Sequence, residues 1–199
     1  MKKILAMLLC TAAVVCGMSS CLGDDDNGPT LEEIQSAMRE LGGTYEGYMV
    51  YAPSQTIVPD TVRNMQWTID SVLTIKAFPQ NVLVKSFSES VDSSLLADVK
   101  ALPAKDLKCY IGFYSVGENG YTMNVMPHSI KFTAMKGEKA HDCEVVFMSH
   151  NDQSLGVYQK SNKHLEFMMN TYGLMMDSVL QDNNLFKVTY FKLVSTSKH

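Results

Sequence analysis

Hydrophobic and polar residues alternate with a period of two over long parts of the chain. In the stretch MQWTIDSVLTIKAF, apolar residues occupy odd positions throughout Met65–Ile75, apart from position 71. This alternation is typical of strands with one buried face, and it predicts one long strand or two strands joined at Asp70-Ser71. Further along, Asn119-Gly120 separates two apolar runs and predicts a β-hairpin.

The second half of the chain contains several more short apolar segments with polar turns between them. They read SIKFTAM, HDCEVVFMS, LGVYQ, HLEFMMNTY and LFKVTYFKL. Short strands at even spacing indicate an antiparallel all-β fold, either a barrel or a β-sandwich.

Two segments follow a helical pattern instead. Residues 30–41 begin with Thr30 and Glu33, which form a capping box, and Gly42-Gly43 ends the segment. Its apolar face consists of Leu31, Ile34, Met38 and Leu41. A second, inserted helix is predicted over residues 91–102, because its apolar residues recur at helical spacing and Pro103 follows. We therefore expect one mainly β domain over residues 30–199 with an N-terminal helix and one short inserted helix.

The beginning of the chain resembles a bacterial lipoprotein signal. Two lysines precede an apolar run, ILAMLLCTAAVV, that is too short for a stable transmembrane helix. The small residues Ser19 and Ser20 come directly before Cys21. The resemblance implies that residues 1–20 are removed and that the Cys21 thiol is acylated. An ordinary soluble secreted protein is the alternative.

An acidic run follows Cys21 within a tether predicted over residues 21–29. Asp24–Asp26 resemble the export signal of Bacteroidetes lipoproteins, which implies anchoring in the outer membrane with the domain facing the cell exterior. A simpler interpretation is a solvated polar tether, and both can hold together.

The order of segments resembles uncharacterised Bacteroidetes surface lipoproteins with a lipocalin-like barrel. The resemblance rests on the Cys21 signal, the N-terminal helix, Tyr45-x-Gly47, the Ile75–Pro79 segment and the His141–Phe147 strand. It implies a lipocalin-like fold and a lipid-anchored location, and such families generally have no assigned activity.

Charge and cysteine content narrow the range of functions. Without residues 1–20 the chain carries 15 Lys and Arg against 21 Asp and Glu, a net charge of −6. A mildly acidic domain is not expected to bind nucleic acid. Two cysteines remain in the domain, Cys109 and Cys143. A disulfide between them would close a loop of about 34 residues and contribute about 3–4 kcal/mol; two buried free thiols are the alternative.

No residue pattern points to catalysis, a metal or a cofactor. The chain has neither a G-x-S-x-G elbow nor a P-loop. His141 and Cys143 alternate with Asp142 and Glu144, which would point to the opposite face of a strand, and the spacing matches no closed zinc site. We therefore expect a protein that is not an enzyme.

Methionine is abundant, with 14 residues, and it suggests a pocket. Flexible thioethers such as Met169, with Trp67, Phe167 and Tyr172 as aromatic walls, would form a candidate pocket for a small apolar ligand. The alternatives are plain core filling and a thioether copper site.

Two functions remain as the main hypotheses, and an enzyme of small scope, with titratable residues converging in a cleft, is a third. The leading one is a non-catalytic cell-surface module that binds a small apolar or amphipathic ligand. The other is a structural or interaction protein, accessory to an outer-membrane complex. A cavity inside the barrel would favour the first hypothesis, and a filled barrel with an exposed apolar patch the second.

Overall fold

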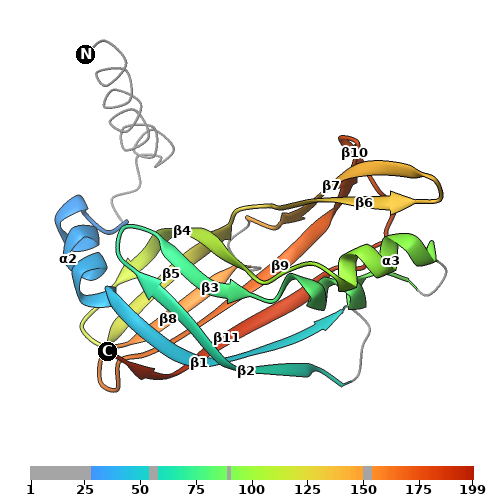
Figure 1. The fold of residues 1–199 in the computed structure, drawn as a ribbon. Coiled ribbons are helices and arrows are strands. Elements are labelled where there is room, and N and C mark those ends of the chain that lie inside the picture. The colour runs from blue at the N-terminus through green and yellow to red at the C-terminus, as the bar shows by residue number, and fades with distance from the viewer. Residues whose placement is uncertain (1–27, 54–57, 89–90, 150–153) are drawn as a thin grey trace, which may run out of the picture.

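The computed structural model describes residues 28–53, 58–88, 91–149 and 154–199 (Figure 1). Cys21, the predicted signal peptide over residues 1–20 and most of the predicted tether lie outside these residues. No helix within the described ranges is long and apolar enough to cross a membrane.

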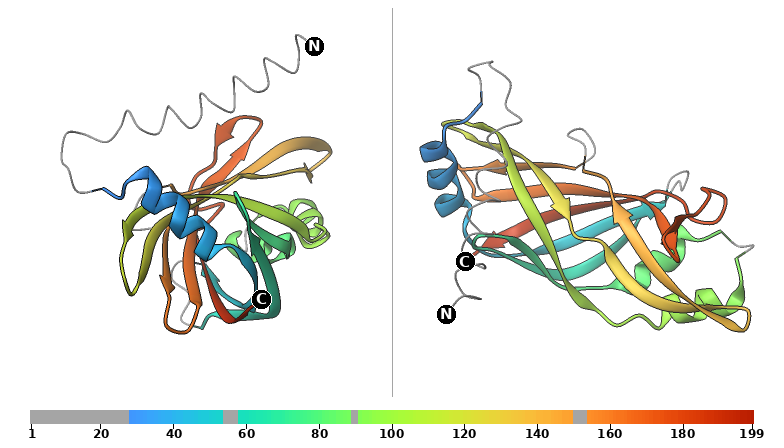
Figure 2. Two further views of the ribbon diagram at one scale, coloured as in Figure 1. Left: turned by 90° about the vertical axis from the view of Figure 1, so that its left-hand side faces the viewer. Right: turned by 90° about the horizontal axis from the view of Figure 1, so that it is seen from above.

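Eight antiparallel strands form a closed barrel (Figures 1 and 2), which confirms the mainly β barrel expected from the sequence. In order around the barrel they are β1 (Gly43–Pro53), β2 (Asp60–Ile69), β3 (Leu73–Phe78), β4 (Lys105–Val116), β5 (Gly120–Pro127), β8 (Leu155–Gln159), β9 (His164–Met176) and β11 (Thr189–Lys198). The barrel closes because β11 pairs with both β1 and β9. Residues 65–78 thus form two strands, with the turn at Asp70-Ser71.

A small sheet extends from one end of the barrel. The first half of β9 pairs with β8 and β11, whereas its second half pairs with β7 (Lys139–Phe147) and with the two-residue strand β10 (Val179–Leu180). β6 (Ile130–Lys136) pairs with β7 and completes the small sheet. A register shift between Val146 and Phe147, opposite β9, marks where β9 leaves the barrel.

The helix α2 (Leu31–Leu41) covers the other end of the barrel, where the C-terminus also lies (Figures 1 and 2). The predicted capping box is present, because Glu33 N–H donates to the Thr30 hydroxyl and Thr30 N–H donates to the Glu33 carboxylate. The buried side chains of the helix are Ala37 and Leu41, whereas Leu31, which we expected on the apolar face, is 64% exposed.

Polar contacts hold α2 against the barrel rim. The Tyr45 hydroxyl donates to the carbonyl oxygen of Leu41 at 2.6 Å. The Tyr121 hydroxyl donates to the Glu40 carboxylate, and this hydrogen bond holds the pKa of Glu40 below its usual value. Lys198 on β11 donates to the backbone oxygen of Glu40. These contacts fix α2 as a lid on this end of the barrel.

The interior of the barrel is filled by large side chains. Trp67, Tyr45, Tyr158, Phe78, Phe167, Phe191 and Met49 are among the largest fully buried residues. At the end away from α2, the 3-10 helix η1 (Gln80–Ser86) closes the barrel together with the segment before β11. The Ser86 and Thr189 hydroxyls share a hydrogen bond there, and the rings of Phe87 and Phe186 meet edge to face.

The inserted helix α3 (Ser93–Lys100) lies beside β6, and its presence confirms the helix expected over residues 91–102. It covers part of the free edge of β6. Asp98 and Ser94 bind the backbone N–H and oxygen of Met135, and Asp92 accepts from the N–H of Gly137. These side chains satisfy backbone groups that would otherwise be free to pair with another strand.

Candidate docking site

The structure divides the four residues of the predicted ligand pocket. Trp67, Phe167 and Met169 lie together inside the barrel and are fully or almost fully buried. The rings of Trp67 and Phe167 meet edge to face at 5.7 Å between centroids. Tyr172 lies outside the barrel and is 54% exposed. Three of the four residues therefore form core, and the predicted grouping with Tyr172 is wrong.

The two cysteines of the domain are free thiols, so the disulfide interpretation is wrong and the alternative of buried thiols holds. The Cys109 sulfur lies inside the barrel, 4.0 Å from the sulfur of Met169. Cys143 lies in the small sheet, where its thiol donates to the backbone oxygen of His141 at 3.7 Å. Each thiol thus has its own contact in a different part of the fold.

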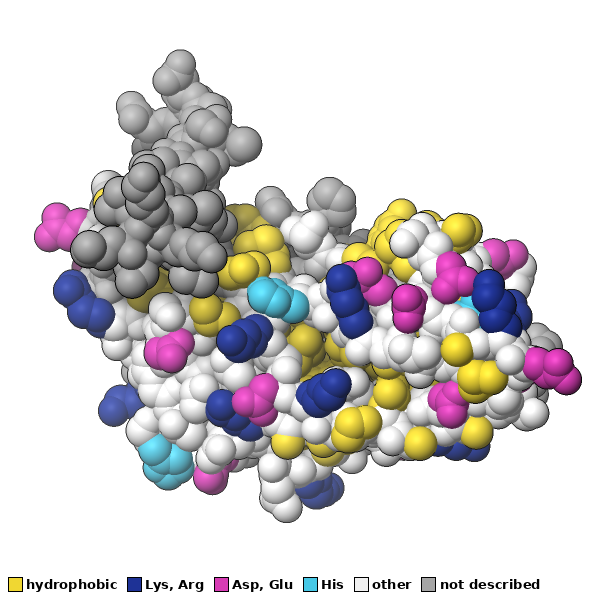
Figure 3. Space-filling view, turned by 45° about the horizontal axis from the view of Figure 1, so that its top comes forward, with side chains coloured by type: hydrophobic (Ala, Val, Ile, Leu, Met, Phe, Trp, Pro, Cys, Tyr) yellow, Lys and Arg dark blue, Asp and Glu magenta, His cyan; other side chains and the backbone are white. Residues whose placement is uncertain are grey.

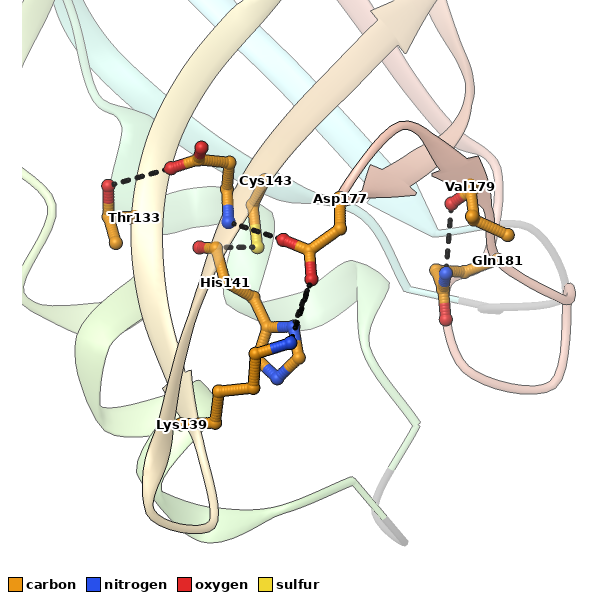
Figure 4. A network of polar contacts seen from close by, with 8 residues as sticks. Thr133, Lys139, His141, Cys143, Asp177, Val179 and Gln181 are labelled. Carbon is orange, nitrogen blue, oxygen red and sulfur yellow. Dashed lines mark hydrogen bonds and ion pairs between the residues drawn. The ribbon is translucent and has the colours of Figure 1, made fainter.

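A polar network in the small sheet is centred on Asp177, in the turn between β9 and β10 (Figure 4). Its carboxylate lies 2.9 Å from Nδ1 of His141 and accepts from the backbone N–H of Asp142 at 3.1 Å. The Lys139 ammonium lies 3.5 Å away. These partners, the Asp142 N–H foremost, hold the pKa of Asp177 below its usual value. The network ties the β9–β10 turn to β7.

The same network does not build a nucleophilic site. His141, Cys143 and Asp177 are the residue types of a catalytic triad, but the Cys143 thiol donates to the backbone of His141 rather than to its ring. Burial, reinforced by Asp177 and Asp142, raises the pKa of Cys143 to about 11, which opposes the thiolate that such chemistry needs. Within the described ranges, no group of three or more His, Cys, Asp or Glu side chains is placed to hold a metal ion.

The outer face of the small sheet carries a groove of about 420 Å³. It is lined by Lys131 and Thr133 from β6, Asp142 and Glu144 from β7, Met175 from β9, and Ser178, among others. Strand pairing sets Glu144 between Lys131 and Met175, and Met175 opposite Leu180 of β10. A carboxylate row and an apolar row thus run side by side across this face.

Two large aliphatic side chains are exposed on β10, with Leu180 on the groove side of the sheet and Val179 on the other side. Val179 is 62% exposed and Leu180 is 49% exposed. The turn before them has positive φ at both Asp177 and Ser178. This is the backbone conformation of two-residue hairpin turns, whose twist matches the twist of the flanking strands. Gly173 allows Leu180 to lie close to β9, because a Cβ there would come within 2.9 Å of a Leu180 methyl carbon. The fold thus holds Leu180 close against β9 at the surface.

We call this region the distal surface; it consists of Met175, Leu180, Asp142 and Glu144 on the groove side of the sheet, with Val179 of the edge strand β10 on the other side. Figure 3 shows hydrophobic side chains next to acidic ones over the β6–β7 hairpin and β10, at the right-hand end of the molecule. Tyr172 and Met168 on β9 and Tyr190 on β11 are further large apolar side chains exposed on neighbouring strands.

A family model for a domain of unknown function, DUF4840, matches residues 40–176, well over half of the chain. The chain belongs to the DUF4840 family. The matched region runs from the end of α2 through β9 and includes the carboxylates and Met175 of the distal surface. No curated protein and no solved structure matched this DUF4840 chain.

The sequence reasoning missed Val179 and Leu180 of this DUF4840 domain. The stretch MMDSVL places two apolar pairs on either side of Asp177-Ser178, which is the pattern of a tight hairpin. The signal was weak because neither central residue is Gly or Asn, the residues that usually mark such turns.

Proposed function

We propose that this DUF4840 protein is a non-catalytic interaction module that is anchored by an acylated Cys21 in the outer membrane, faces the cell exterior and binds a protein partner through the distal surface. One observation carries the proposal: the barrel interior is filled and covered at both ends, while large aliphatic side chains are held in the open at the distal surface.

The filled interior favours the interaction hypothesis over the small-ligand hypothesis. A lipocalin-type carrier needs a cavity within the barrel to enclose its ligand. Here Trp67 stacks on Tyr45 and meets Phe167, so aromatic rings occupy that position. By contrast, large apolar side chains that lie exposed together commonly mark interaction sites.

The position of the anchor supports a role for the distal surface at a distance from the membrane. Seven residue positions separate Cys21 from Gly28, which allow a reach of about 25 Å at full extension. The described chain begins at Gly28, directly before α2. From the α2 end β9, with 13 residues, extends about 43 Å to the β9–β10 turn. The distal surface is therefore presented away from the anchor.

The proposal predicts that the double variant Val179→Ser/Leu180→Ser loses its partner. Each of these side chains would contribute about 1.5–3 kcal/mol if fully buried in a complex, so recovery of the partner should fall at least about tenfold. The measurement is chemical cross-linking in the native cells, followed by purification of the tagged full-length protein and quantitative mass spectrometry of the cross-linked proteins.

Leu31→Ser is the matched control, since Leu31 is similarly exposed but lies at the α2 end. It should leave recovery of the partner unchanged. Thermal melting of all three proteins checks that the fold is kept, because substitutions at exposed positions usually change stability by no more than about 0.5 kcal/mol. Equal recovery of every cross-linked protein by the double variant and the wild type would rule out the proposal.

A further inference from the structure

We infer that the partner of the distal surface is a protein segment in which a Lys or Arg side chain is flanked by apolar side chains. This inference rests on the proposed function and adds the chemistry of the partner. It follows from three features of the small sheet: its carboxylate row, its adjoining apolar row and its guarded edge.

The carboxylates of the groove have capacity for a further partner. The carboxylate of Asp142 accepts a long, weak hydrogen bond from the Thr133 hydroxyl, at 3.5 Å. Glu144 lies 3.6 Å from the ammonium of Lys131, whose side chain is largely exposed and so forms a weak ion pair. Asp177 differs, since its two oxygens already face His141, the Asp142 N–H and Lys139. A cation entering the groove therefore has two carboxylates to meet.

The apolar row lies directly beside these carboxylates. Glu144 is the strand neighbour of Met175, and Met175 is the neighbour of Leu180. A residue with a positive charge over Asp142 and Glu144 thus places its own sequence neighbours over Met175 and Leu180. Charged and apolar contacts arranged side by side in this way fix both the register and the orientation of a bound segment.

The free edge of the small sheet is less suited to binding than its face. A peptide that adds as a strand needs a row of free backbone groups. Asp98 and Ser94 of α3 already bind the backbone of Met135 on β6, and Asp92, the N-cap residue of α3, binds the backbone of Gly137 in the turn that follows β6. The partner therefore lies across the face of the sheet, in the groove.

Both ends of the described chain lie at the α2 end of the barrel, away from the distal surface. The C-terminus is tied to the α2 end, because His199 and Thr44 exchange backbone hydrogen bonds. The described chain begins at Gly28, next to the start of α2 at the same end (Figure 1). A membrane surface is also disfavoured, since the acylated Cys21 holds the opposite end of the barrel toward it. A separate protein fits the position and chemistry of the surface.

The test is selection of random peptides, displayed on phage, against the full-length acylated protein in detergent. We expect the selected peptides to be enriched in Lys or Arg next to apolar residues. A synthetic selected peptide should bind Asp142→Asn/Glu144→Gln at least about tenfold more weakly, because charge-assisted hydrogen bonds are lost. Glu138→Gln, in the β6–β7 turn, is the matched control and should bind like the wild type.

The outcomes separate the two proposals. Selected peptides without basic residues, or peptides that bind Asp142→Asn/Glu144→Gln as well as the wild type but lose binding to Val179→Ser/Leu180→Ser, would overturn the basic-segment inference and leave the interaction module standing. If no peptide is selected, or if binding is unaffected by Val179→Ser/Leu180→Ser, both proposals fail. Sedimentation of the protein alone completes the test, because self-association through this surface would mean that the partner is a second copy.

Discussion

Replacing Trp67 by Ala should lower the free energy of unfolding by about 3–5 kcal/mol. The Trp67 side chain is fully buried, stacks on Tyr45 at 6.2 Å between centroids and meets Phe167 edge to face. The substitution removes the largest side chain of the barrel interior together with both ring contacts, each of which adds to the effect of burial. Because Trp67 is the only tryptophan, unfolding in denaturant is best followed by circular dichroism.

Tyr172→Ala is the informative comparison, since sequence reasoning placed Tyr172 beside Trp67. Its side chain is about half exposed outside the barrel, so the loss should stay near 0.5 kcal/mol, as is usual for surface positions. A loss at Tyr172 as large as that at Trp67 would contradict the assignment of Trp67 to the core and Tyr172 to the surface.

The second large effect is expected at Gly47 on β1, which lies against Val194 of β11 and Trp67 of β2. A Cβ at this position would overlap the carbonyl oxygen of Val194 and come within 2.9 Å of the Trp67 ring. Gly47→Ala therefore forces β1 away from β11, the strand that closes the barrel, and should cost about 3 kcal/mol in stability. Denaturant unfolding measures this loss directly.

Gly112→Ala serves as the control for chain flexibility. Gly112 lies on β4, and the nearest neighbour of an added Cβ is the Met126 methyl carbon at 3.9 Å, an ordinary contact. This variant should be as stable as the wild type or gain up to about 1 kcal/mol, because alanine restricts the unfolded chain. Equal effects at Gly47 and Gly112 would show that β1 and β11 are not packed as closely as the structure has them.

The strands and helices were largely predictable because local patterns determine them. Alternation over Met65–Ile75, the Asn119-Gly120 turn and the Thr30–Glu33 capping box each depend on residues close together in the sequence. Barrel closure was harder to predict, since β1 and β11 stand at opposite ends of the domain. Tyr45-x-Gly47 was the local hint of it, and the structure explains this motif by the space that Trp67 and Val194 need.

The candidate site could not be predicted from the sequence, and the physical reason lies in β9. This strand changes partners half-way, and the register shift opposite Val146 and Phe147 breaks the period of two. Asn170 and Thr171 are consequently both buried although they are neighbours. Alternation alone places Tyr172 on the same face as Met168, opposite Met169; the pocket prediction grouped Tyr172 with Met169 by residue type, as an aromatic wall. The methionine doublet Met168-Met169, which precedes the shift, does divide as expected, with Met168 exposed and Met169 buried.

The central claim is that the barrel is a filled scaffold that presents a protein-binding surface. Native mass spectrometry of the full-length protein purified from its own membranes tests this claim most directly. We predict a chain that begins at an acylated Cys21 and carries no small-molecule adduct, alone or with a protein partner that Val179→Ser/Leu180→Ser fails to retain. A discrete small-molecule adduct that recurs between preparations and persists in that variant would contradict the account and restore the ligand-binding barrel.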